Sequence, residues 1–196
     1  MAPKPVPSQL SAFHQTVKRV TLEKRRKHDW RSSMLTLILA RHAKSDWSQS
    51  VSDHERPLNN RGLRQAPLLG ERLNQSGYAP TLIISSDARR TEETALLLQS
   101  TWTDVELIYD HRLYLGSLSD IAHTLNQFAH DERTVCVVGH NPGFSVAAAL
   151  LGRTSVELKT ACAAVLTSPA STWAEALEDQ NFEFVGLFEG REHSND

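Results

Sequence analysis

Several class-defining features are missing from this sequence. None of its apolar runs approaches the roughly 18 to 20 residues that a membrane-spanning helix needs. Its two cysteines, Cys136 and Cys162, stand in apolar runs and form neither a metal-binding motif nor a disulfide framework. With 196 residues, 40% of them hydrophobic and 22% charged, the chain is long enough for one domain with a real core. We expect a globular protein of a reducing, cytoplasmic compartment with no membrane partner.

A formal net charge of −2 conceals a strong asymmetry along the chain. Residues 1–33 carry eight Lys or Arg against two acids, which is +6, so residues 34–196 carry −8. We interpret 1–33 as a basic N-terminal extension, poorly ordered or partly helical, with Met34 as a candidate ordinary start. The alternatives are a transit peptide for organelle import and an arm that binds an acidic surface. The acidic body argues against a nucleic-acid partner.

From residue 35 onward, hydrophobic periodicity alternates between strand and helix patterns. The pattern predicts helices over 61–75, 88–99, 117–129 and 142–151, with Leu63 and Leu96 among the buried positions. It predicts strands over 35–40, 81–85, 105–109, 134–139, 161–167 and 182–188. This alternation indicates an α/β fold, a three-layer α/β/α sandwich with a mostly parallel sheet and the last two strands antiparallel at its edge.

Two of these strands run directly into histidines. Arg41 and His42 follow the first strand, and His140 follows the fourth. Open α/β sheets bind ligands outside the carboxyl ends of their parallel strands. An arginine and two histidines delivered there are typical of a site that handles phosphate.

Four motifs carry a resemblance to a known family. They are Arg41-His42-Ala43-Lys44-Ser45-Asp46-Trp47, the stretch from Asp53 to Gly62, the stretch from Ser85 to Ala95, and Val138-Gly139-His140-Asn141-Pro142-Gly143. In this order they resemble the histidine phosphatase superfamily, which has the phosphoglycerate-mutase-like fold. Ala-Lys after Arg-His is similar to the SixA-type phosphohistidine phosphatases. The match runs from about Leu35 to Leu151.

The resemblance implies a role for each residue of a phosphate pocket. His42 would be the nucleophile that forms a covalent phosphohistidine, and His140 would stabilise the transition state. Arg41 and Arg90 would hold the phosphate oxygens, with Arg89 as the alternative to Arg90. Ser45 and Ser48 stand where related mutases contact phosphate. We expect Lys44 and Arg56 to be solvated loop charges.

Substrate class depends on a general acid. Family members that cleave alkyl phosphate esters protonate the leaving alkoxide with an acid in the loop after the third strand. In that loop, Asp110 and His111 are the candidates, and Asp110 is better explained as a cap or a partner of Arg112. An imidazole leaves with much less help than an alkoxide. A missing acid therefore favours phosphohistidine as substrate.

We therefore expect residues 34–196 to form a metal-independent, cofactor-free phosphatase domain acting on a phosphohistidine-containing signalling or phosphorelay protein. The alternatives are a small-molecule phosphomonoesterase with Asp110 or His111 as its acid, and a non-catalytic phosphoprotein-binding module. No metal is assigned, because cations surround His42 and His140. The remaining histidines, among them His54 and His111, are interpreted as scattered surface residues. Oligomeric state is left open.

Overall fold

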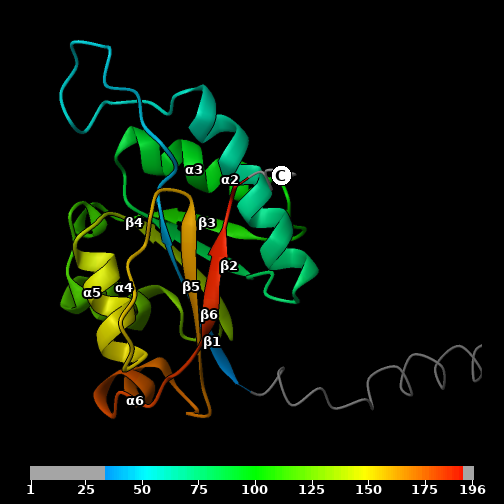
Figure 1. Ribbon diagram of the computed structural model, residues 1–196. Coiled ribbons are helices and arrows are strands. Elements are labelled where there is room, and N and C mark those ends of the chain that lie inside the picture. The colour runs from blue at the N-terminus through cyan, green and yellow to red at the C-terminus, as the bar shows by residue number, and fades with distance from the viewer. Residues whose placement is uncertain (1–33, 192–196) are drawn as a thin grey trace, which may run out of the picture. The chain divides into compact units, whose positions relative to one another are not determined.

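One mixed sheet organises the part of the chain that the computed structural model describes, residues 34–191. Residues 1–33 and 192–196 lie outside the described residues, together with the predictions made for the N-terminal extension. Within 34–191, six strands pair in the order β3-β2-β4-β1-β5-β6 (Figure 1). They are β1 (Leu35–Arg41), β2 (Leu82–Ser85), β3 (Glu106–Tyr109), β4 (Thr134–Gly139), β5 (Cys162–Ser168) and β6 (Glu183–Glu189).

The register of the parallel strands decides where the site forms. β1 runs parallel to β4 with Arg41 opposite Gly139, and β2 runs parallel to β4 with Ser85 opposite Val138. The three carboxyl ends therefore meet at one edge, which places His42 and His140 on adjacent strand ends. β5 and β6 are antiparallel additions beside β1, as the sequence predicts.

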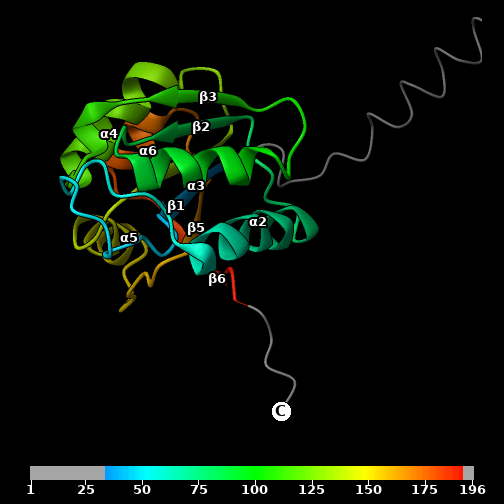
Figure 2. The same ribbon diagram turned by 90° about the horizontal axis from the view of Figure 1, so that it is seen from above.

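Strand alternation divides the core between the two faces of the sheet. One face packs Leu37, Leu39 and their neighbours against α4 (Leu118–Phe128), α5 (Gly143–Leu151) and α6 (Trp173–Glu178). The opposite face packs Ile38 and Ala40 against α2 (Asn60–Gln75) and α3 (Arg89–Gln99). Helices α2 and α3 lie side by side over that face (Figures 1 and 2). The predicted three-layer α/β/α sandwich is confirmed.

Local signals explain where the helices begin. The Asn59 side chain accepts a hydrogen bond from the Gly62 backbone N–H at the start of α2. Ser117 and Asp120 form a reciprocal capping box at the start of α4. In the described residues, no helix combines the length and the apolar character that a membrane crossing would require.

Two residues that the sequence predicted to be buried are exposed in the structure, and two short helices were missed. Leu63 is 45% exposed and Leu96 is 52% exposed, because the buried stripes of α2 and α3 turn away from both side chains. Helix α6 and the 3-10 helix η2 (His111–Leu113) were not predicted. Each is too short for its periodicity to stand out from a loop.

Candidate active site

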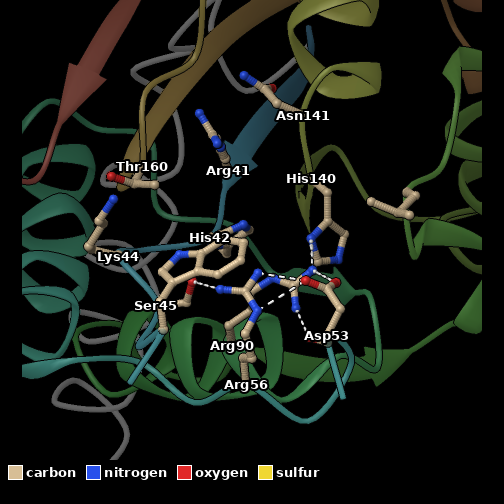
Figure 3. Close-up of a pocket in the computed structure, with 12 residues that line it drawn as sticks. Arg41, His42, Lys44, Ser45, Asp53, Arg56, Arg90, His140, Asn141 and Thr160 are labelled. Carbon is tan, nitrogen blue, oxygen red and sulfur yellow. Dashed lines mark hydrogen bonds and ion pairs between the residues drawn. The ribbon is translucent and has the colours of Figure 1, made fainter. Parts of the chain in front are cut away.

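A pocket of about 240 Å³ opens at the carboxyl ends of β1, β2 and β4 (Figure 3). The five residues that the sequence predicted for the phosphate site, Arg41, His42, Ser45, Arg90 and His140, all line it. Its other lining residues are Lys44, Trp47, Asp53, Arg56, Leu115, Asn141 and Thr160. Ser48 does not line it, and its hydroxyl instead donates to Asp46 at 2.8 Å.

His42 is held as a neutral imidazole with a defined free nitrogen. Its side chain is buried, and its Nδ1 lies 2.7 Å from the backbone carbonyl of Ala43, which can only accept a hydrogen bond. Nδ1 therefore carries the proton, and the lone pair is on Nε2. Burial lowers the pKa of His42 to about 3, and the charges of Arg90 and Arg41 act in the same direction. A neutral Nε2 is the form in which an imidazole attacks phosphorus.

His140 faces His42 across the pocket, with ring centroids 5.2 Å apart. Its Nδ1 accepts from Nη2 of Arg90 at 3.2 Å, so its Nε2 carries the proton and donates to Ser86 Oγ at 3.0 Å. Burial lowers the pKa of His140 to about 3, with further lowering from His42 and Arg90. Both histidines are therefore neutral at pH 7.

Arg90, at the beginning of α3, is the inward member of the Arg89-Arg90 pair. It is 2% exposed, and its Nη2 pairs with Asp53 at 2.9 Å. The Arg89 side chain is 49% exposed and pairs with Glu93 on the helix surface. The helix N-terminus adds its own preference for an anion at this point. The structure thus separates two arginines that the sequence alone left as alternatives.

Arg41 lines the same pocket from the end of β1. Its Nη1 donates to the carbonyl of Leu158 at 3.0 Å, which also accepts from Asn141 Nδ2 at 2.8 Å. The Nε atoms of Arg41 and Arg90 are buried and have no hydrogen-bond partner. Two unpaired buried guanidinium N–H groups beside one pocket suit a bound anion.

Arg56 is not a solvated loop charge, as the sequence indicated, but a buried wall of the pocket. It is 7% exposed, its Nη1 donates to Ser45 Oγ at 2.7 Å, and its Nη2 pairs with Asp53 at 2.7 Å. The Trp47 ring covers its guanidinium at 3.6 Å from the centroid. Sequence reasoning missed Arg56 and Asp53, although both stand in the second motif of the family resemblance. The sequence signal that could have indicated their pairing is the presence of an Asp and an Arg three residues apart.

Asp53 is a carboxylate in this pocket, and it is ionised. Burial alone would raise its pKa, but hydrogen bonds from Arg56 and Tyr114, with the charge of Arg90, outweigh burial and lower the pKa to about 2. Figure 3 shows Asp53 beside the guanidinium groups of Arg56 and Arg90, both of which donate to it. With Arg41 and Lys44 also present, the described lining residues carry four cationic groups against one anionic group. The net positive charge of the lining therefore favours an anionic ligand.

The two candidate general acids, Asp110 and His111, lie outside the pocket lining. The Asp110 carboxylate accepts a hydrogen bond from the Arg112 backbone N–H at 3.0 Å and forms an ion pair with the Arg112 guanidinium at 2.9 Å. It also accepts a hydrogen bond from the Thr124 hydroxyl at 3.1 Å. The interpretation of Asp110 as a cap and ion-pair partner is thus what the geometry shows. His111 contacts Asp87, as His54 does, so these two histidines are not scattered but meet at one carboxylate.

Comparisons with known proteins agree with this geometry. Residues 37–114 match the family model of the histidine phosphatase superfamily (branch 1). An uncharacterized chloroplastic protein of Arabidopsis thaliana is 36% identical over 154 residues, covering 71% of this chain and 69% of that protein. A metal-independent phosphoserine phosphatase of Arabidopsis thaliana is 32% identical over 80 residues, 39% of this chain and 33% of that enzyme.

Among solved structures, the fold is similar to that of a candidate phosphohistidine phosphatase SixA from Nakamurella multipartitia. The TM-score is 0.69 at 26% identity, over 83% of this chain and 98% of that one. The predicted SixA-type resemblance is confirmed at the level of family and fold. With paired neutral histidines and arginines at the strand ends, the chain belongs to the histidine phosphatase superfamily and is a phosphatase of SixA type.

Proposed function

We propose that the protein removes the phosphoryl group from phosphohistidine on another protein, through a phosphohistidine intermediate on its own His42. Arg41, Arg56 and Arg90 hold the phosphoryl oxygens. The arginines stabilise the charge that develops on them in the transition state, and His140 supports this step by holding Arg90 through its Nδ1.

The reaction divides into two displacements. His42 Nε2 attacks phosphorus, the bond from phosphorus to the substrate imidazole breaks, and its electron pair leaves on that imidazole nitrogen. Water then attacks phospho-His42, releases inorganic phosphate and returns the electron pair to Nε2, with the surplus proton going to solvent. The tautomer fixed by Ala43 supports the first step, since Nε2 needs no deprotonation before it attacks.

The substrate class rests on one observation, the pairing of the Asp53 carboxylate with the guanidinium groups of Arg56 and Arg90, which keeps it ionised. Among the described lining residues it is the one carboxylate, and a pKa of about 2 prevents it from donating a proton at pH 7. Alkoxide leaving groups need that proton in the transition state. A phosphohistidine protonated on its second ring nitrogen leaves as a neutral imidazole, so it needs no acid from the enzyme.

An apolar rim supports a phosphate carried on a protein. The side chains of Trp47 and Leu115 are 72% and 61% exposed, and both border the pocket. Exposed aromatic and aliphatic groups around a charged centre are typical of surfaces that contact another protein. We infer a partner that presents its phosphohistidine on a convex surface.

The test compares initial phosphate release from a phosphohistidine-carrying protein domain and from p-nitrophenyl phosphate, both in EDTA. The proposal predicts efficient release from the first, feeble release from the second, and loss of both in His42→Ala. The exposed-histidine variant His123→Ala serves as the matched control and should retain wild-type rates.

Equal or faster turnover of the ester would overturn the substrate assignment. It would favour the second candidate, a small-molecule phosphomonoesterase, for which the partial match to a phosphoserine phosphatase is the supporting observation. Binding of the phosphoprotein without turnover would favour the non-catalytic binding module.

A further inference from the structure

His54, Asp87 and His111 form a cluster outside the pocket that the phosphatase mechanism does not use. His54 Nε2 lies 3.0 Å from one oxygen of Asp87, and His111 Nδ1 lies 2.8 Å from the other. One ligand atom from each residue falls within 4.8 Å of the others. The residues come from three segments: the loop before α2, the turn between β2 and α3, and η2. Only the tertiary fold brings them together.

The geometry points to a binding site for a divalent transition-metal ion, Zn²⁺ in particular, with His54 Nε2, Asp87 and His111 Nδ1 as ligands. Two imidazoles and one carboxylate are a donor set that zinc accepts, whereas Mg²⁺ and Ca²⁺ prefer oxygen alone. With bonds of about 2.0 to 2.2 Å, ligand atoms around tetrahedral zinc lie roughly 3.3 Å apart. The two short contacts with Asp87 are already close to this spacing.

A second carboxylate prepares His54 for this role. His54 Nδ1 lies 3.4 Å from Glu55 Oε1. When a metal ion replaces the proton on Nε2, the remaining Nδ1–H of His54 faces Glu55, and the Nε2 lone pair is directed toward the ion beside Asp87 and His111. Metal-binding histidines commonly hold their second ring nitrogen against a carboxylate in this way.

The cluster is open to solvent on one side. The side chain of His111 is 75% exposed, and those of His54 and Asp87 are 30% and 31% exposed. An ion can therefore enter, the exposed His111 ring can rotate to close the remaining distance, and water can take a fourth position. Without an ion, the same contacts serve as hydrogen bonds from the two imidazoles to Asp87.

A bound ion would stabilise the position of one wall of the phosphate pocket. Tyr114 packs its ring against His54 at 4.9 Å and against His140 at 5.4 Å, and its hydroxyl donates to Asp53 at 2.8 Å. The Arg89 backbone N–H also donates to the His54 carbonyl at 3.0 Å. The ion would tie the loop that carries Asp53 to the start of α3, without touching the reacting phosphate.

The experiment titrates the metal-free full chain with Co²⁺, a spectroscopic substitute for zinc, and follows its visible absorption. We expect one saturable tetrahedral site per chain, displaced by Zn²⁺. His111→Asn and Asp87→Asn should each weaken the affinity at least about tenfold, since each removes one of three protein ligands. His123→Asn, an exposed histidine on α4, is the matched control and should not change it.

Thermal unfolding gives a second readout. Zn²⁺ at about a hundredfold excess over its dissociation constant should raise the Tm of the wild type by roughly 5 °C, and by much less in both variants. Absence of a saturable site, or an equal affinity in wild type, His111→Asn and Asp87→Asn, would overturn the proposal. Phosphatase turnover in EDTA is independent of this result, so either proposal can fail alone.

Discussion

At the scale of single residues, the site depends on how a few cationic side chains are held around one ionised carboxylate. Asp53 accepts from Arg56 and Arg90 in the absence of substrate. A phosphoryl group entering the pocket must compete for the same guanidinium donors. Asp53 therefore keeps both arginines in place and also opposes the binding of a dianion.

Arg90 and Arg89 allow a matched test of the phosphate-binding arginines. We expect Arg90→Ala to lower kcat/KM by roughly 10² to 10³, because it removes a buried cation from the phosphoryl oxygens. Arg89→Ala removes a surface partner of Glu93 and should change kcat/KM less than about threefold. Initial rates on the phosphohistidine substrate measure both. Equal losses in the two variants would show that Arg90 acts through the fold of α3 and not through phosphate.

Substitution of Asp53 tests its opposing charge. Asp53→Asn keeps the shape of the side chain and removes the anion, so inorganic phosphate should inhibit roughly tenfold more strongly. Asp46→Asn changes a half-buried carboxylate of the same loop that does not line the pocket, so this control should leave inhibition unchanged. Weaker inhibition in Asp53→Asn would mean that orienting Arg56 and Arg90 matters more than the repulsion.

The sequence was sufficient to predict the location of site residues that directly follow a strand. His42 and His140 follow runs of buried apolar residues, so their common location follows from the parallel register alone. Arg56 lies in an aperiodic loop, and its inward position depends on contacts that no local pattern encodes. They include the backbone bonds from Asp46 to Pro57 and from Asn59 to Lys44.

At the scale of elements, the segment after β3 distinguishes the two candidate substrate classes. Asp110 caps η2 and pairs with Arg112, and it also ties η2 to Thr124 of α4. These contacts give Asp110 a structural role. His111 at the surface contacts Asp87 and not the pocket.

Asp110→Asn should therefore affect stability more than catalysis. We expect the free energy of unfolding to fall by about 1 to 2 kcal/mol, from the weakened cap and the lost ion pair. The rate of phosphohistidine hydrolysis at saturating substrate should stay within about threefold of wild type. Urea unfolding and kcat measure the two effects. A hundredfold loss of kcat on p-nitrophenyl phosphate would instead identify Asp110 as the acid of an ester hydrolase.

Long elements were predictable and short ones were not. The helices over residues 61–75 and 117–129 carry several turns of apolar periodicity and clear caps, and the structure has them within a residue or two. Helix α6 buries only Trp173 and Ala176, so six residues contain too little pattern to identify it. Apolar periodicity placed Leu63 and Leu96 on the buried helix faces, whereas in the structure both are exposed and the polar Gln65 and Thr94 are buried.

At the scale of the whole molecule, the buried histidines couple stability to pH. The pKa values of His42 and His140 are about 3 in the folded protein, below the ordinary value of 6.5. The unfolded chain therefore takes up protons first as pH falls, and stability is lost progressively below pH 6.5, down toward pH 3. Above that range, both states are neutral at these positions and contribute no pH dependence.

A comparison with His42→Asn isolates this effect. On acidification from about pH 7 to about pH 5.5, the wild type should lose about 1 kcal/mol more unfolding free energy than the variant. Urea denaturation at the two pH values measures the difference, and His123→Asn should behave as wild type. Identical losses in wild type and His42→Asn would show that His42 titrates normally, which contradicts its assignment as a neutral buried nucleophile.

Covalent phosphorylation of His42 is the central chemical claim, and a rapid-quench experiment tests it most directly. The enzyme is mixed with a radiolabelled phosphohistidine protein, quenched in alkali within one turnover, and the label is located by mass spectrometry. The account predicts acid-labile, alkali-stable phosphate on His42 that forms before inorganic phosphate and is absent in His42→Ala. Phosphate release by the wild type with no labelled intermediate at any time, or a label that persists in His42→Ala, would contradict it.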